Sequence, residues 1–100
     1  MASTKETIKS DFKAHIQNNG GNYSNWYVGI AADPKARLFN DHSVQEHGGA
    51  WIYDQAMSSD SAREVEDYFI NVLGTQGGPG GGDSNTDWVY AYKITSSTRE

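Results

Sequence analysis

Apolar residues recur near the start of the chain at the spacing of one helix face. Ile8, Phe12 and Ile16 are each four residues apart, which places them on one side of an α-helix. Ser3 and Glu6 precede this pattern at the spacing of a capping box. An Asn-Asn-Gly-Gly stretch then interrupts it. The chain is therefore predicted to begin with one amphipathic helix.

Three later segments are rich in aromatic and β-branched residues and are predicted to be strands. They cover residues 25–31, 50–57 and 88–95. Successive side chains of a strand point to opposite faces. In the first strand one face then carries Trp26, Val28 and Ile30, and the other carries Tyr27, Gly29 and Ala31. Gly29 leaves space beside Tyr27, and a glycine in a strand marks either a close approach by a ligand or another backbone or a β-bulge.

Two more helices are predicted between the strands. Asp33 and Pro34 suit a helix start, as N-cap and first helical residue, and this short helix is expected to end near His42. A second capping box precedes the clearest helix, over residues 62–73, which Gly74 ends. Ser61 and Glu64 form that box. The order helix, strand, helix, strand, helix, strand predicts an α+β fold with a small three-stranded, mainly antiparallel sheet flanked by helices.

The 100 residues and 11.0 kDa of the chain predict a single domain over residues 1–100. Cysteine is absent, which excludes disulfides, Cys-ligated metals and a thiol nucleophile. No apolar run approaches the roughly 18 residues of a membrane-spanning helix. The first residues also lack the apolar region of a secretory signal. We therefore expect a cytoplasmic protein with no membrane contact.

Charge and loop composition limit how the chain can meet nucleic acid. Eight Lys and Arg against thirteen Asp and Glu give a net charge of −5, so bulk electrostatics do not attract a polyanion. Any nucleic-acid site must therefore be small and locally positive, and binding is expected to be weak. The glycine-rich segment 75–87 precedes a strand and lacks the Lys-Ser/Thr of a phosphate-binding loop, so it is interpreted as a connector.

One carboxylate interrupts the apolar face of the predicted 62–73 helix. At about 100° per residue, Glu66 falls between Ile70 and Leu73, inside an arc that Val65, Phe69 and Val72 extend. An isolated buried carboxylate costs several kcal/mol unless it is paired, protonated or metal-bound. Glu66 is therefore expected to be in a buried salt bridge, to reach water through a rotated helix, or to hold a hard cation or move protons.

Two residues that follow the first predicted strand in the chain are candidates for binding an anion or transferring a proton. Arg37 could clamp a phosphate or carboxylate with two hydrogen bonds, although a lone surface arginine would have no such role. His42, at the end of the same predicted helix, could supply a proton near neutral pH. The alternative for His42 is a histidine favoured by the negative end of the helix dipole.

Taken in chain order, these residues resemble the GIY-YIG nuclease superfamily. The match consists of Tyr-Val-Gly at 27–29, Arg37, His42 and Glu66, and it spans roughly half of the chain. His42 follows Arg37 by five residues where four is usual in the family, and Asp41 occupies the usual position. The resemblance implies a small α+β domain, with an arginine on the helix after the strand and a metal-binding glutamate on a later helix.

The family's first motif is missing from its usual place before Tyr27. Residues 91–94, Ala-Tyr-Lys-Ile, look like that motif, with Tyr92 at the position of its tyrosine. We therefore expect a circularly permuted version in which the last strand pairs beside the strand of Tyr27.

The resemblance implies phosphodiester hydrolysis with Mg²⁺ or Mn²⁺. Tyr92 or Tyr27 would orient or deprotonate the attacking water, and Arg37 would stabilise the charge on phosphorus. Glu66 would hold the metal ion against the leaving oxygen.

Two other functions remain open. A non-catalytic relative would bind a protein or other partner, with an aromatic surface from Tyr23, Trp51, Tyr53 and Trp88. A carboxylate-based hydrolase would instead use Glu66 together with Asp54.

Overall fold

The computed structural model describes residues 2–45, 49–77, 86–96 and 98, and it has the α+β fold predicted above. Most of the glycine-rich connector, residues 78–85, lies outside this range. The elements are α1 (Lys5–Asn18), η1 (Tyr23–Asn25), β1 (Trp26–Ala31), η2 (Ala36–Asp41), β2 (Trp51–Gln55), α2 (Ser59–Tyr68), η3 (Phe69–Leu73) and β3 (Trp88–Lys93).

The last strand of the chain is the central strand of the sheet. The order is β1-β3-β2, and β3 is antiparallel to both neighbours. Tyr27 stands opposite Tyr92, and Gly29 opposite Tyr90. The expected pairing of the last strand with the strand of Tyr27 is therefore confirmed.

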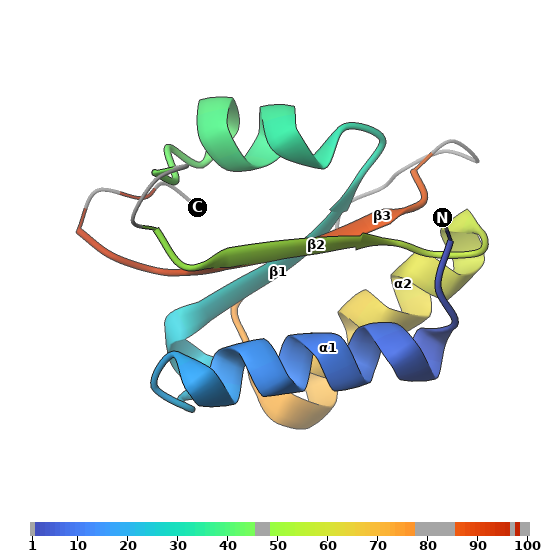
Figure 1. Ribbon diagram of the computed structural model, residues 1–100, viewed down its shortest axis with the longest axis horizontal. Helices are drawn as coiled ribbons and strands as arrows, with labels where there is room; N and C mark the ends of the chain where they lie inside the picture. Colours follow the sequence, from blue (N-terminus) through green and yellow to red (C-terminus); the bar gives the residue numbers. More distant parts are fainter. Residues whose placement is uncertain (1, 46–48, 78–85, 97, 99–100) are drawn as a thin grey trace.

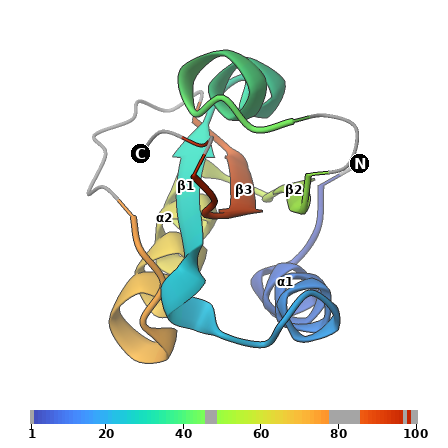
Figure 2. The same ribbon diagram turned by 90° about the vertical axis from the view of Figure 1, so that its left-hand side faces the viewer.

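Helices cover both faces of the sheet, as Figures 1 and 2 show: α1 and α2 lie against one face and η2 lies against the other. The α1–α2 side holds the larger apolar core, formed by Ile8, Phe12, Ile16, Trp26, Val28, Ile30, Ala56, Ala62, Val65, Phe69, Val89 and Ala91. The η2 side holds a second cluster, formed by Ala31, Leu38, Val44, Tyr90 and Tyr92. The alternation predicted for the first strand thus separates the two cores.

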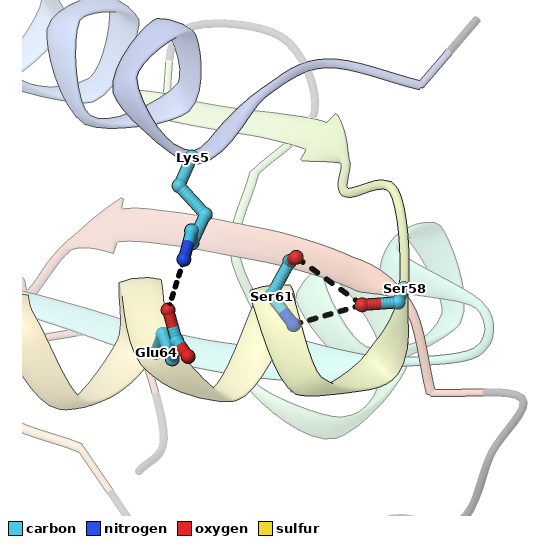
Figure 3. Close-up of polar contacts among 4 residues, drawn as sticks. All are labelled: Lys5, Ser58, Ser61 and Glu64. Carbon is cyan, nitrogen blue, oxygen red and sulfur yellow. Dashed lines mark hydrogen bonds and ion pairs between the residues drawn. The ribbon is translucent and has the colours of Figure 1, made fainter.

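Both capping boxes in the sequence analysis are wrong by one to three residues. The N-cap of α1 is Thr4, whose hydroxyl accepts from the Thr7 N–H. The N-cap of α2 is Ser58, which accepts from the Ser61 N–H at 3.1 Å and contacts its hydroxyl (Figure 3). Ser58 is extended, at φ −159° and ψ 168°, so the helix begins before Ser61 can act as a cap.

The packing of α1 against α2 includes one ion pair between the helices. Lys5 contacts the carboxylate of Glu64, and both side chains are partly exposed (Figure 3). Exposed pairs of this kind add little to stability, so the buried apolar face holds the two helices together.

The predicted 62–73 helix changes its winding part of the way along. After Tyr68 it continues as the π-helical segment η3, and Gly74, at φ 85°, ends it as predicted. Each residue of a π-helix advances less around the axis than in an α-helix. Val72 is consequently 67% exposed, and its place in the apolar arc was wrong.

Among the described residues no helix is both long and apolar enough to cross a bilayer.

Candidate functional site

Four aromatic side chains from three elements meet on the face of the sheet that η2 covers. Tyr27 comes from β1, Tyr90 and Tyr92 from β3, and His42 from the end of η2. The ring centroid of His42 lies 4.8 Å from Tyr27, 4.9 Å from Tyr92 and 5.5 Å from Tyr90. We call these four residues the tyrosine–histidine cluster.

Two tyrosine hydroxyls bracket the imidazole of His42. Its Nε2 is 2.8 Å from the Tyr90 hydroxyl, and its Nδ1 is 3.1 Å from the Tyr92 hydroxyl. A neutral imidazole donates through one nitrogen and accepts through the other, so one tyrosine donates to the ring and the other accepts from it. Because His42 is only 4% exposed, this hydrogen-bonded chain is held away from bulk water. It fixes the orientation of the imidazole ring.

Tyr27 is the member of the tyrosine–histidine cluster that lies at the protein surface. Its ring stacks on Tyr92 with centroids 5.2 Å apart and 19° between planes. Tyr27 is half-buried, whereas Tyr92 is 0% exposed. Of the two tyrosines named from the sequence, Tyr27 is therefore the one that a molecule in solution can reach. The buried ring of Tyr92 packs against it.

A π-helical turn accounts for the five-residue spacing of Arg37 and His42. Within η2 the His42 N–H donates to the Arg37 carbonyl at 2.9 Å, an i to i+5 bond. Residues five apart in such a turn lie nearly above one another, as residues four apart do in an α-helix. Asp41 is exposed, and its carboxylate pairs with Arg37 Nε at 3.5 Å. The π-helical turn thus leaves His42 on the same side of η2 as Arg37.

The start of this helix was predicted correctly, because Asp33 Oδ1 accepts from the Ala36 N–H at 3.2 Å.

Arg37 and Tyr90 interact directly. Hydrogen bonding to Tyr90 is the largest influence on the pKa of Arg37 and raises it above its ordinary value. Burial raises the pKa of Tyr90 to about 12, although the hydrogen bond from Arg37 acts to lower it. Tyr90 therefore stays protonated and aligned between His42 and the guanidinium. The Arg37 side chain as a whole is about half exposed, at 49%.

Gly29 makes room for the ring of Tyr90. A Cβ at this position would lie 2.5 Å from the Tyr90 hydroxyl oxygen and 2.6 Å from the ring carbon that bears it. Both distances are far below van der Waals contact. Because Tyr90 is only 1% exposed, its ring cannot move aside without displacing packed neighbours. The open space foreseen beside Tyr27 is thus filled by a tyrosine from the neighbouring strand.

Gly29→Ala is expected to lower the free energy of unfolding by about 1–3 kcal/mol, the usual cost of overpacking a core. Urea unfolding of Gly29→Ala, Tyr90→Leu and the double variant measures this cost. Most of the penalty should disappear in the Tyr90→Leu background, because the clashing ring is gone. An equal penalty in both backgrounds would show that Tyr90 is not the constraint.

Glu66 is buried, as its place in the apolar stripe predicts. It is 4% exposed, and burial followed by the nearby charge of Asp67 raises its pKa to about 7. Arg63 acts in the opposite sense but does not cancel these effects. The alternative in which a rotated helix exposes Glu66 to water is therefore wrong, and a fully compensating salt bridge does not fit the raised pKa. The charge of Glu66 also acts to raise the pKa of Tyr90, which links it electrostatically to the tyrosine–histidine cluster.

Glu66 is the metal ligand that the sequence analysis named. In the described part of the chain no group of three or more His, Cys, Asp or Glu residues forms a ready metal cage. Mg²⁺ commonly takes one or two protein carboxylates and completes its shell with water and substrate phosphate oxygens. A cation would also compensate the unfavourable burial of the Glu66 charge.

Asp54 lies on β2, close to Asp11 on α1. Burial and the side chain of Asp11, on α1, raise its pKa to about 6. Glu66 is not among the groups that act on this carboxyl. The aromatic surface foreseen for a binding module also divides: Tyr23 packs against the α1–α2 core, whereas Trp51 and Tyr53 border the η2-side cluster.

Tyr90 is the site residue that the sequence analysis did not single out. It alternates with Trp88 and Tyr92 in the last strand, which places all three on one face. The strand register alone places it opposite Gly29. A glycine beside a motif tyrosine, facing a strand of alternating aromatics, is the signal that could have identified it.

Comparison of the chain with protein-family models, with curated proteins and with solved structures found no match.

Proposed function

We propose that this chain hydrolyses nucleic-acid phosphodiesters with a divalent metal ion, through a GIY-YIG-like site in a circularly permuted chain. The observation that supports this proposal best is the convergence of residues from distant parts of the sequence. Tyr27, His42 and Tyr92 form one contact cluster, and Arg37 joins it through Tyr90. A purely structural core would not require two buried tyrosine hydroxyls, an imidazole and a guanidinium in one network.

Arg37 binds the scissile phosphate in this proposal. Its side chain is about half exposed, and the guanidinium can donate two parallel hydrogen bonds to phosphate oxygens. Tyr90 holds one side of the group, so less conformational freedom is lost when phosphate binds. The fixed guanidinium then stabilises the charge that develops on phosphorus in the transition state.

Tyr27 is the surface member of the tyrosine–histidine cluster. Its hydroxyl orients the attacking water, while its ring remains stacked on Tyr92 and His42. Tyr92 and Tyr90 are buried and act as positioning residues, since each fixes one nitrogen of His42. This arrangement keeps the imidazole in one orientation beside Tyr27.

Glu66 would hold Mg²⁺ or Mn²⁺ when one is bound. The ion would supply Lewis-acid activation of the phosphate and charge compensation at the leaving oxygen. Glu66 itself must be ionised to bind it, and its pKa of about 7 makes metal affinity fall below neutral pH.

The proposal is tested by incubating the wild-type chain with single-stranded, duplex and branched DNA in Mg²⁺, Mn²⁺ or EDTA. We expect cleavage of at least one substrate with metal and none with EDTA. Glu66→Ala should abolish it, whereas Glu64→Ala, a carboxylate on the exposed side of the same helix, should leave it unchanged. Absence of cleavage by the wild type with either metal would contradict the proposal and leave the binding module.

A further inference from the structure

Next to η2, whose Phe39 meets Trp51 edge to face at 5.1 Å, the same sheet face carries a row of half-buried aromatic rings. Trp51 and Tyr53 are stacked, with centroids 5.7 Å apart and 8° between planes. Tyr53 meets Trp88 edge to face at 5.6 Å. We call Trp51, Tyr53 and Trp88 the aromatic platform.

The platform ends in an open hollow of about 400 Å³. Its walls are Ala32, Asp33, Pro34, Lys35, Tyr53 and Trp88. A second hollow of about 300 Å³ contains Arg37 and shares Ala32 and Asp33 with the first. The turn after β1 therefore separates an aromatic hollow from the hollow that holds the phosphate-binding arginine of the proposed site.

We propose that the hollow at Trp88 and Tyr53 binds an unpaired nucleobase of the strand whose phosphate Arg37 holds, so that the substrate is single-stranded or frayed nucleic acid. This inference rests on the proposed function and specifies its substrate class. A nucleotide joins a flat aromatic base to an anionic phosphate through one sugar. Two hollows that share a wall, one aromatic and one with a guanidinium, match that pair of chemistries.

The charges around the aromatic hollow favour a nucleotide over an apolar ligand. Lys35 is exposed at its wall and can meet a backbone phosphate. Asp33 is the only acidic wall residue among those described, and its carboxylate accepts the Ala36 N–H. A base inside a duplex is stacked and paired, so only an unpaired base can offer its face to Trp88.

The test measures binding in EDTA, so that it depends neither on metal nor on cleavage. Fluorescence anisotropy compares a labelled single-stranded oligonucleotide, as DNA and as RNA, with a duplex of the same sequence. The wild type should bind a single strand more tightly than the duplex. Trp88→Ala should weaken that binding about tenfold, from the ~1–3 kcal/mol that one stacked base contributes. Trp88→Phe should retain most of the affinity.

Val72→Ala is the matched control, because Val72 is an exposed apolar residue on η3, away from the platform. Its affinity should equal that of the wild type, and circular dichroism should show the same fold for every variant. The base-binding site would be overturned if Trp88→Ala bound the single strand as tightly as the wild type does, or if the wild type preferred the duplex. Binding of a proline-rich peptide instead of the oligonucleotide would also overturn it.

The two proposals fail separately. If the wild type cleaves DNA but Trp88→Ala binds single strands as tightly as the wild type, the base-binding site is wrong and the nuclease proposal stands. If the wild type never cleaves but binds single strands through Trp88, the catalytic proposal is wrong and the base-binding site stands.

Discussion

Replacing Arg37 by alanine is expected to lower the rate of phosphodiester cleavage by about 10²–10³-fold. Loss of one fixed donor to a developing charge typically has this effect, which corresponds to about 3–4 kcal/mol of transition-state stabilisation. Arg37→Lys should recover only part of the rate, because an ammonium cannot form the paired hydrogen bonds of a guanidinium. Single-turnover cleavage at saturating DNA measures the chemical step without the contribution of substrate binding.

The fold should tolerate this substitution. The ion pair of Arg37 with Asp41 joins two exposed groups, and such pairs add little to stability. Lys9→Ala removes one positive charge from α1, on the opposite face of the sheet, and is the control for the change in net charge. A loss smaller than about threefold for Arg37→Ala, or an equal loss for Lys9→Ala, would contradict the assigned role.

Replacing Glu66 by glutamine is expected to stabilise the protein above neutral pH. Burial raises the pKa of Glu66 from 4.5 to about 7 in the folded chain. The folded state therefore binds the proton more tightly than the unfolded state does. Stability from this group is complete below pH 4.5, declines as the pH rises from 4.5 to about 7, and is lost above that.

Glu66→Gln removes the ionisation and keeps nearly the same shape. At pH 8 its free energy of unfolding should exceed that of the wild type by about 2–3 kcal/mol, and at pH 4.5 the two should be nearly equal. Urea unfolding at several pH values measures the difference. Asp54 also titrates, with a pKa of about 6, but it is present in both proteins and cancels in the comparison.

Metal ions supply an independent check on Glu66. Mg²⁺ at pH 8 should raise the melting temperature of the wild type and leave that of Glu66→Gln unchanged. Glu64→Gln is the matched control, because Glu64 is an exposed carboxylate on the same helix whose pKa is lowered by Lys5. It should show neither the stabilisation at high pH nor any loss of the metal response. A Glu66→Gln gain that does not depend on pH would contradict the ionisation account.

Several features of the site could be predicted from local sequence rules. The alternation of the first strand placed Tyr27 and Gly29 on one face, because successive strand residues point to opposite sides. Asp33 was correctly identified as a helix cap, and its side chain does accept the Ala36 N–H. The helical position of Glu66 lies between apolar neighbours, and of the alternatives that this left open the buried one is observed.

Local rules failed where several residues satisfied the same rule. Ser3 and Thr4 are both suitable helix caps, as are Ser58 and Ser61, and the choice depends on where the chain leaves the extended conformation. Val72 was misplaced because the wheel assumed α-helical winding past Tyr68, where the chain becomes a π-helix.

The sequence by itself determined which side chains each strand and helix offers, because those periods follow from backbone geometry within a few residues. Only the tertiary structure decided which of them meet. Antiparallel register set Tyr90 against Gly29, and the wide turn of η2 brought His42 between two tyrosine hydroxyls. Contacts between residues about fifty positions apart arise from how whole elements pack, and no short stretch of sequence contains that information.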